Sequence, residues 1–210
     1  MSIKHEFLSL MNSGGPVMCL IFIVACIAMV LLVWEAVRNL RLMKGARCDY
    51  NHLRLESDYF PGNIGDVNPV AQLYQAVNWS TVETKEDTVR ELNIHLREIT
   101  PRIEGSLTTI AILASLLPML GLLGTVTGMI NVFDVIALQG SGNPSAMADG
   151  ISQALLTTAS GLIIAIPVIF LHHLMSQRVK ALMVITQQAA QLMMHRDINV
   201  LKKGYAHVGR

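Results

Sequence analysis

Three long stretches of apolar side chains set the organisation of the chain. The first, PVMCLIFIVACIAMVLLV from Pro16 to Val33, would be about 27 Å long as a helix, enough to cross a bilayer. The second lies within Ser106–Leu138 and the third within Ile151–Leu171. As a helix the second would reach about 50 Å, so we expect it to project beyond the hydrocarbon. The pattern predicts an all-α membrane protein with three transmembrane helices.

The basic residues outside these stretches indicate how the chain is oriented. They follow the first stretch, precede the second and follow the third: Arg38, Arg41, Lys44, Arg47, Arg97, Arg102, Arg178 and Lys180. The link 139–150 has none. By the positive-inside rule, residues 1–15 and 139–150 face the periplasm, and 36–105 and 176–210 lie in the cytoplasm. The transmembrane helices are then 16–35, 106–138 and 151–175. The first is too long for a cleaved signal segment, so we expect it to be retained.

Helix signals continue through the two cytoplasmic parts. Asn68-Pro69 is typical of a helix start, and Ser80 with Glu83 fits a capping box that opens a helix over 83–103. Pro101 predicts a kink or a break before the second span, and residues 60–69 read as a loop. The expected apolar faces are Val70, Leu73 and Val77; Leu92, Leu96 and Ile99; and Val179, Leu182, Met183, Ala190 and Met193. These regions predict long cytoplasmic helical extensions.

Composition excludes several functions. The chain is 52% hydrophobic and 15% charged, against about 25% charged in soluble proteins. A net charge of +1, with no basic run, argues against nucleic-acid binding. No nucleophile triad, metal-ligand spacing or phosphate loop occurs, so we expect no enzyme activity, metal or cofactor. His172 and His173 are adjacent and read as interfacial side chains rather than ligands.

Small and hydroxyl side chains form a stripe on the second and third spans. Its members are Pro118, Gly121, Thr125, Gly128 and Val132, then Gly150, Ala154, Thr158, Gly161 and Ala165, with Gly124 adding a G-x-x-x-G pair. Such residues let membrane helices pack closely, and threonines can bond to their own helix, so packing alone is one interpretation. Counted from Ile110 and His173, however, Thr125 and Thr158 lie at the same depth, about 22 Å along. The second interpretation is a polar lining.

An ion path normally needs an ionisable group inside the bilayer, and the spans have none. Glu35 and Asp134 stand at span ends on opposite sides, and Glu104 stands at the cytoplasmic entry. If an ion crosses here, its carboxylate comes from another polypeptide.

The two spans resemble a known family. Pro118-Met-Leu-Gly121-Leu-Leu-Gly124-Thr125-Val-Thr-Gly128-Met resembles the second-span motif of the MotA/TolQ/ExbB proton-channel family. Residues 150–167, GISQALLTTASGLIIAIP, resemble its third-span motif. Three spans and an outward N-terminus are most like ExbB.

The resemblance implies a homopentamer in the bacterial inner membrane around two helices of a single-span, ExbD-like partner. The partner's Asp would carry the proton, with Thr125 and Thr158 lining its surroundings. A TonB-like protein would transmit the force to outer-membrane nutrient uptake. Lipids are the remaining expected partners. The residues expected to set helix packing and pore shape are Pro118, Gly121, Gly124, Gly128, Ala154, Gly161 and Pro167.

One position departs from the family pattern. Many relatives have Glu where this chain has Gln153, and Gln cannot titrate. We expect Gln153, like Glu104, to contact a neighbouring subunit.

Three alternatives stay open: a TolQ-like subunit that maintains the envelope, a passive packing scaffold, and an independent channel. The residues do not choose between protons and sodium.

Overall fold

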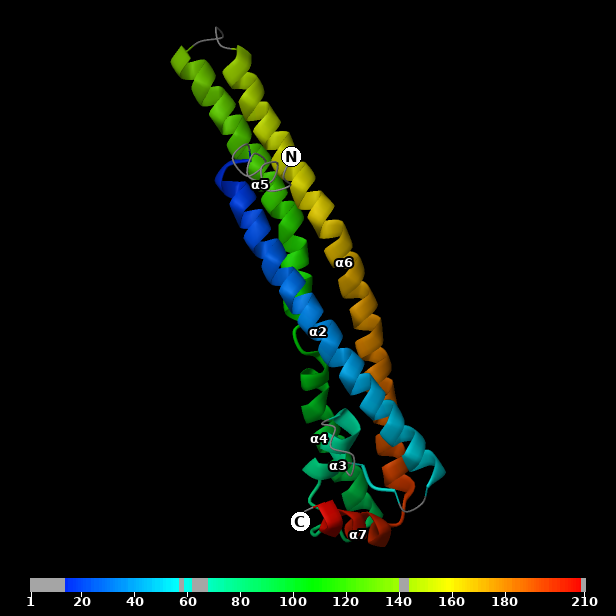
Figure 1. Cartoon of the computed structure of the whole chain (residues 1–210). Helices are drawn as coiled ribbons and strands as arrows, with labels where there is room; N and C mark the ends of the chain where they lie inside the picture. The colour runs from blue at the N-terminus through cyan, green and yellow to red at the C-terminus, as the bar shows by residue number, and fades with distance from the viewer. Residues whose placement is uncertain (1–13, 57–58, 62–67, 140–143, 209–210) are drawn as a thin grey trace. The chain divides into compact units, whose positions relative to one another are not determined.

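The computed structural model describes residues 14–56, 59–61, 68–139 and 144–208, with the backbone alone for 139 and 205–208. Their helices are α2 (Gly15–Leu55), α3 (Pro69–Ala76), α4 (Lys85–Glu104), α5 (Leu107–Gln139), α6 (Pro144–His195) and α7 (Ile198–Val208) (Figure 1). The described chain has no strand, which confirms the all-α class. Residues 1–13, 62–67 and 140–143, and with them most of the expected periplasmic N-terminus and parts of the loop and link, lie outside the described residues.

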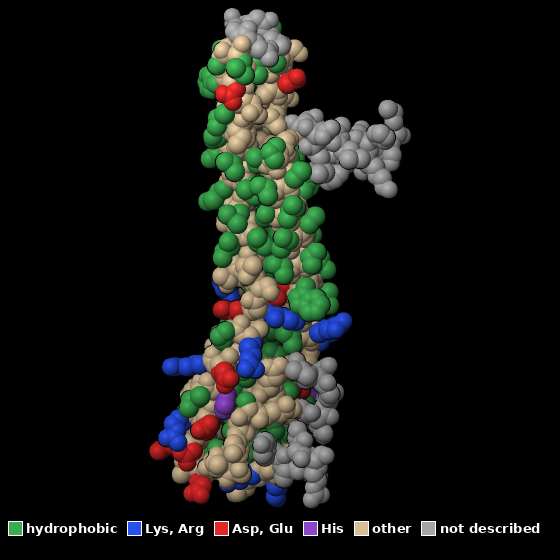
Figure 2. Space-filling model, turned by 90° about the vertical axis from the view of Figure 1, so that its left-hand side faces the viewer, with side chains coloured by type: hydrophobic (Ala, Val, Ile, Leu, Met, Phe, Trp, Pro, Cys, Tyr) green, Lys and Arg blue, Asp and Glu red, His purple; other side chains and the backbone are tan. Residues whose placement is uncertain are grey.

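The chain divides into two compact units. The apolar unit comprises Met1–Val33 and Thr108–His173, and the charged unit comprises Trp34–Leu107 and Leu174–Arg210. Three helical stretches are long and apolar enough to cross a membrane, as predicted. On the face drawn in Figure 2, hydrophobic side chains cover most of the apolar unit. The predicted helix 106–138 matches α5, whereas α6 begins seven residues before the predicted third span.

The first helix packs in the apolar unit through one narrow stripe. Met18, Ile21, Ala25, Ala28 and Leu32 are buried and follow one another at steps of three or four residues. That spacing places them on one side of α2. Most of its other side chains are exposed and apolar, as lipid contact requires.

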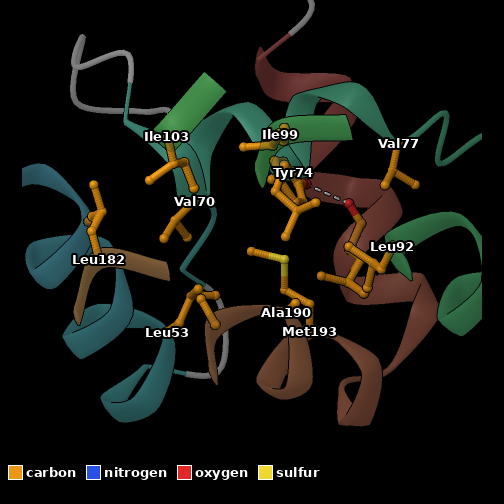
Figure 3. Packing of buried hydrophobic residues seen from close by; sticks show 14 of the residues in the cluster. Leu53, Val70, Tyr74, Val77, Leu92, Ile99, Ile103, Leu182, Ala190 and Met193 are labelled. Carbon is orange, nitrogen blue, oxygen red and sulfur yellow. Dashed lines mark hydrogen bonds between the residues drawn. The ribbon is translucent and has the colours of Figure 1, made fainter. Parts of the chain in front are cut away.

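The charged unit has a conventional hydrophobic core (Figure 3). The predicted apolar faces of α3, α4 and the end of α6 all contribute to it, which confirms them. The largest buried side chains are Trp79 and Tyr74. The Tyr74 hydroxyl donates to the Leu201 carbonyl at 2.7 Å, and Trp79 Nε1 donates to the Tyr74 carbonyl at 2.8 Å. Because both polar tips have partners, these two large rings can be buried at little cost.

A chain of hydrogen bonds fixes the start of α3. Asn68 caps it, as predicted, because its Oδ1 accepts from the Val70 and Ala71 amides at 3.0 Å. The Asn68 side-chain amide donates to the Asp49 carboxylate on α2 at 3.0 Å. Asp49 also accepts from the Tyr59 hydroxyl at 2.6 Å. Burial and the hydrogen bond to Asp49 raise the pKa of the Tyr59 hydroxyl well above its usual range. Tyr59 therefore stays a donor at any physiological pH.

The capping box predicted at Ser80 and Glu83 is wrong. Helix α4 begins at Lys85, and the box is formed by Thr84 and Asp87. Ser80 instead donates to the Asn78 side chain at 2.5 Å, within a turn that precedes the helix. The Ser-x-x-Glu spacing was present, but the Asn78 side chain and the buried Val82 hold that segment outside the helix.

The break before α5 falls at Gly105 rather than at Pro101. Pro101 lies inside α4, and the Gly105 amide donates to the Pro101 carbonyl at 3.1 Å. Gly105 has φ +54°, a conformation that other residues rarely adopt. Arg38 lies against it and donates to the Ile103 carbonyl at 3.3 Å, so a side chain from α2 helps to cap α4.

The predicted helical tail over 176–210 is divided into the end of α6 and a separate helix α7, and Arg196 between them closes the unit. Arg196 donates to the carbonyls of Tyr59 at 2.8 Å, Leu53 at 2.5 Å and Glu56. These carbonyls lie at the end of α2 or just beyond it, where no N–H group of the helix is left to donate to them. One guanidinium therefore caps α2.

We expect Arg196→Ala to lower the free energy of unfolding of the charged unit by about 1.5–3 kcal/mol, because it leaves these carbonyls without their donor. Chemical denaturation of the full chain in detergent, followed by circular dichroism, measures this. Arg178→Ala, which removes an exposed arginine from α6, serves as the control. Equal effects of the two changes would contradict the capping role.

The capping box also predicts a dependence on pH. Hydrogen bonds from Thr84 hold the pKa of Asp87 below its ordinary value. The folded state thus prefers ionised Asp87, so its contribution to stability is present above the unfolded pKa, about 3.9, and is lost as pH falls through the lower folded value. Asp87→Asn should destabilise the protein at neutral pH, with the difference vanishing in acid. Unfolding of both proteins measured against pH checks this, and a difference that persists in acid would contradict it.

Candidate functional site

The small-residue stripe is the contact between α5 and α6, which lie side by side and antiparallel (Figure 1). A Cβ added to Gly161 would stand 2.8 Å from the Leu117 carbonyl oxygen and 3.1 Å from the Gly121 Cα. A Cβ on Gly121 would likewise meet the backbone of Thr158 at 3.1 Å. The two backbones thus touch at these glycines, which only a residue without a side chain permits.

Other members of the stripe confirm the same register. Gly124 lies against Thr157, where an added Cβ would be 2.2 Å from the hydroxyl oxygen. Gly128 lies against Ala154, where it would be 2.7 Å from the Ala154 Cβ. Every one of these pairs places a glycine of α5 against a small or hydroxyl residue of α6.

The two predicted lining threonines bond differently. Thr158 Oγ1 donates across the pair to the Gly121 carbonyl at 2.8 Å. Thr125 Oγ1 donates to Leu122 in its own helix at 2.6 Å. The two acceptor carbonyls, of Gly121 and Leu122, belong to successive residues about 1.5 Å apart along α5. The two hydroxyls therefore lie at nearly the same depth, in agreement with the expectation, although the Thr158 backbone lies opposite Gly121, one turn from Thr125.

Both threonines lie on the same face of the pair, and α2 packs on the other. The Gln153 side chain lies against Gly15, the first residue of α2, and accepts from Asn131 of α5 at 3.4 Å. Thr125 precedes Asn131 by six residues and Thr158 follows Gln153 by five, so each is turned about 120–140° away from α2. The half-buried hydroxyls thus stand on a face that α2 leaves uncovered.

The uncovered face is otherwise apolar and uncharged. At the same angular positions α5 carries Leu122 and Met129, and α6 carries Leu162 and Ile169, all exposed. The nearest acidic side chains in the sequence, Asp134 and Asp149, belong to the ends of the two helices. In apolar surroundings two hydroxyls can solvate a polar group from a partner, but they cannot hold a proton of their own.

The remaining predicted residues fall in different places. Pro118 is half-buried beside the stripe, whereas Pro167 is exposed and away from it. Glu104 is exposed at the end of α4 in the charged unit, so it belongs to another unit than Gln153. Gln153 makes its described hydrogen bond within its own chain.

Sequence reasoning missed Thr157 and Asn131. Thr157 is 1% exposed, and its hydroxyl donates back to the carbonyls of Gln153 and Ala154. Its position was readable, because Gly150, Ala154, Thr157 and Gly161 step by four, three and four residues. Asn131 carried no signal, since its partner lies on another helix.

These features define a class: a membrane protein of three long helices, two of them packed through glycines, with hydroxyls on one face. A profile of the MotA/TolQ/ExbB proton channel family matches residues 68–188, more than half of the chain. The chain belongs to that family.

Individual relatives are similar over shorter segments. The biopolymer transport protein exbB1 of Vibrio cholerae is 42% identical over 77 residues, 36% of this chain and 34% of its own length. The Tol-Pal system protein TolQ of Haemophilus influenzae is 33% identical over 95 residues, 45% of this chain and 42% of its own. The biopolymer transport protein ExbB of Neisseria gonorrhoeae is 29% identical over 115 residues, which are 55% of this chain and 50% of its own length. The matched region thus spans a third to a half of these curated relatives.

The glycine contact predicts a steric effect at one position. Gly161→Ala should separate α5 from α6, because the new methyl meets backbone atoms that cannot rotate away. We expect a loss of about 1–3 kcal/mol in stability of the apolar unit, measured by unfolding in mixed detergent. Ala159→Val, at an exposed position of the same helix, adds more volume and should cost less. A smaller effect of Gly161→Ala than of the control would refute the contact.

Proposed function

We propose that this chain is the housing subunit of an ion-driven motor in a bacterial inner membrane. Five copies would surround two helices of an ExbD-like single-span partner, whose Asp carries the proton. The assembly would energise a TonB-like protein for nutrient uptake through the outer membrane. The N-terminus would be periplasmic and the C-terminus cytoplasmic, as the basic residues favour.

The uncovered face of the α5–α6 pair is the observation that carries this proposal. It bears Thr125 and Thr158, it lies away from α2, and the acids and bases of the spans stand near their ends. Each hydroxyl already donates to a backbone carbonyl, and its oxygen can still accept a hydrogen bond from a partner. A partner helix with one carboxylate would use these hydroxyls as hydrogen-bond partners and bring the group that titrates.

The similarity to TolQ of Haemophilus influenzae supports a second candidate, because its 33% identity over 45% of the chain lies between the 42% over 36% of exbB1 and the 29% over 55% of ExbB from Neisseria gonorrhoeae. In that case the same motor would serve envelope integrity. Identification by mass of the partner protein that copurifies with the full chain distinguishes these two functions.

The structure makes Thr125→Val the cleaner test of the lining. The Thr125 hydroxyl bonds only within its own helix among the contacts described, so its loss spares the helix pair. Thr158→Val also removes the bond to Gly121, a contact worth about 0.6 kcal/mol on average in membranes. We expect Thr125→Val to reduce proton-dependent uptake about tenfold or more, the scale of one polar contact of about 1.4 kcal/mol.

Thr127→Val is the matched control. Thr127 also bonds only to its own helix, at Leu123 and Gly124, but stands about 160° around α5 from Thr125. It should leave uptake unchanged, and both variants should assemble normally in size-exclusion chromatography. Normal uptake by the Thr125 variant would favour a passive scaffold. Proton flux through the purified chain alone in liposomes would favour an independent channel.

A further inference from the structure

The charged unit contains a cavity of about 580 Å³ between α2, α3 and α4. Arg38 and Leu42 line it from α2, and Gln72 and Gln75 from α3; the other lining residues are Pro69, Ala76, Glu98, Ile99, Arg102 and Ile103. Its size falls within the range of about 300–1,000 Å³ that is typical of small-molecule sites. Its walls combine an apolar floor with charged groups, as a site for an amphipathic ligand would.

The charged groups at the cavity are balanced. Arg102 bonds to Glu98 at 3.4 Å, and Arg38 bonds to Glu35 at 2.5 Å. Glu35 is fully buried, and among the described residues its Oε2 and Arg38 Nε have no hydrogen-bond partner. Two guanidinium and two carboxylate groups sum to zero. A net anion would leave one negative charge in excess, whereas a ligand with one charge of each sign keeps the balance.

We propose that this cavity binds the headgroup of a zwitterionic phospholipid with a primary amine, of the phosphatidylethanolamine class. The guanidinium groups of Arg38 and Arg102 suit the phosphate, because they donate several hydrogen bonds in a fixed plane. The Glu98 carboxylate suits the ammonium, because its two oxygens, which face Arg102 at 3.4 Å and His95 at 3.3 Å, can each accept a further hydrogen bond. Leu42 and Ile99 suit the apolar glycerol backbone. This site is independent of the motor function proposed above.

The position of Arg38 along α2 favours a membrane lipid as the source. It follows Trp34, which is 69% exposed, by one helical turn. Exposed tryptophans mark the interface between hydrocarbon and water, and Trp34 ends the apolar run of α2. Trp34 and Arg38 are four residues apart and therefore lie on the same side of α2. A headgroup in the cavity would thus have the exposed Trp34 ring beside it, where its chains would begin.

Titration of the full chain in detergent with dihexanoyl lipids tests the site. We expect one dihexanoyl-phosphatidylethanolamine to bind per chain. It should bind about tenfold more tightly than the phosphatidylglycerol and phosphatidylcholine forms, because neither of these headgroups has an ammonium N–H that could donate to Glu98. Arg102→Gln and Glu98→Gln should each weaken it about tenfold. Both residues are exposed enough to be replaced without unfolding the unit.

Arg97→Gln is the matched control, because it removes the same charge from the same helix outside the cavity. It should leave the affinity unchanged. Equal affinity for the three lipids, or unchanged affinity in both cavity variants, would overturn the proposal. Free O-phosphoethanolamine that binds as tightly as the lipid would overturn the membrane source and make the ligand a soluble phosphoamine.

Discussion

The backbone contact between α5 and α6 is the constraint on which the apolar unit depends. Inside a bilayer, apolar side chains gain nothing by leaving lipid, so helices associate through close packing and hydrogen bonds. Gly121 and Gly161 bring the two backbones together, and Thr158 adds a hydrogen bond to the Gly121 carbonyl at the same point. The two helices therefore pack closely as a pair, and α2 and the two threonine hydroxyls lie on opposite faces of this pair.

The two faces carry different chemistry. On one, α2 begins with Gly15 against the Gln153 side chain, which accepts from Asn131, and the φ of +65° at Gly15 favours glycine. On the other, Thr125 and Thr158 remain available. A carboxylate placed permanently in this span would cost about 2.5–3.5 kcal/mol on insertion scales. If a partner supplies the acid, as proposed above, the free subunit avoids that cost.

The sequence predicted features that one helix can encode by itself. Span length, the Asn68 cap and the apolar faces of the charged unit depend on periodicity and local hydrogen bonds, and they were confirmed. The features it missed depend on more than one segment. The backbone register that places Thr158 opposite Gly121 depends on two helices, and counting from span ends does not fix it. Ser80 fitted a capping box, but Asn78 competed for its hydroxyl.

Gln153 shows how one neutral side chain changes the physics of a family position. An ionised Glu there would need a cation or several donors when α2 packs over it, and its charge would change with pH. The side-chain oxygen of Gln153 accepts a hydrogen bond from Asn131 at 3.4 Å, and neither side chain titrates. In this chain the contact between α5 and α6 at Gln153 is therefore one that protons do not alter. In the assembly proposed above, the titrating carboxylate of the partner would lie at the opposite face, where Thr125 and Thr158 stand.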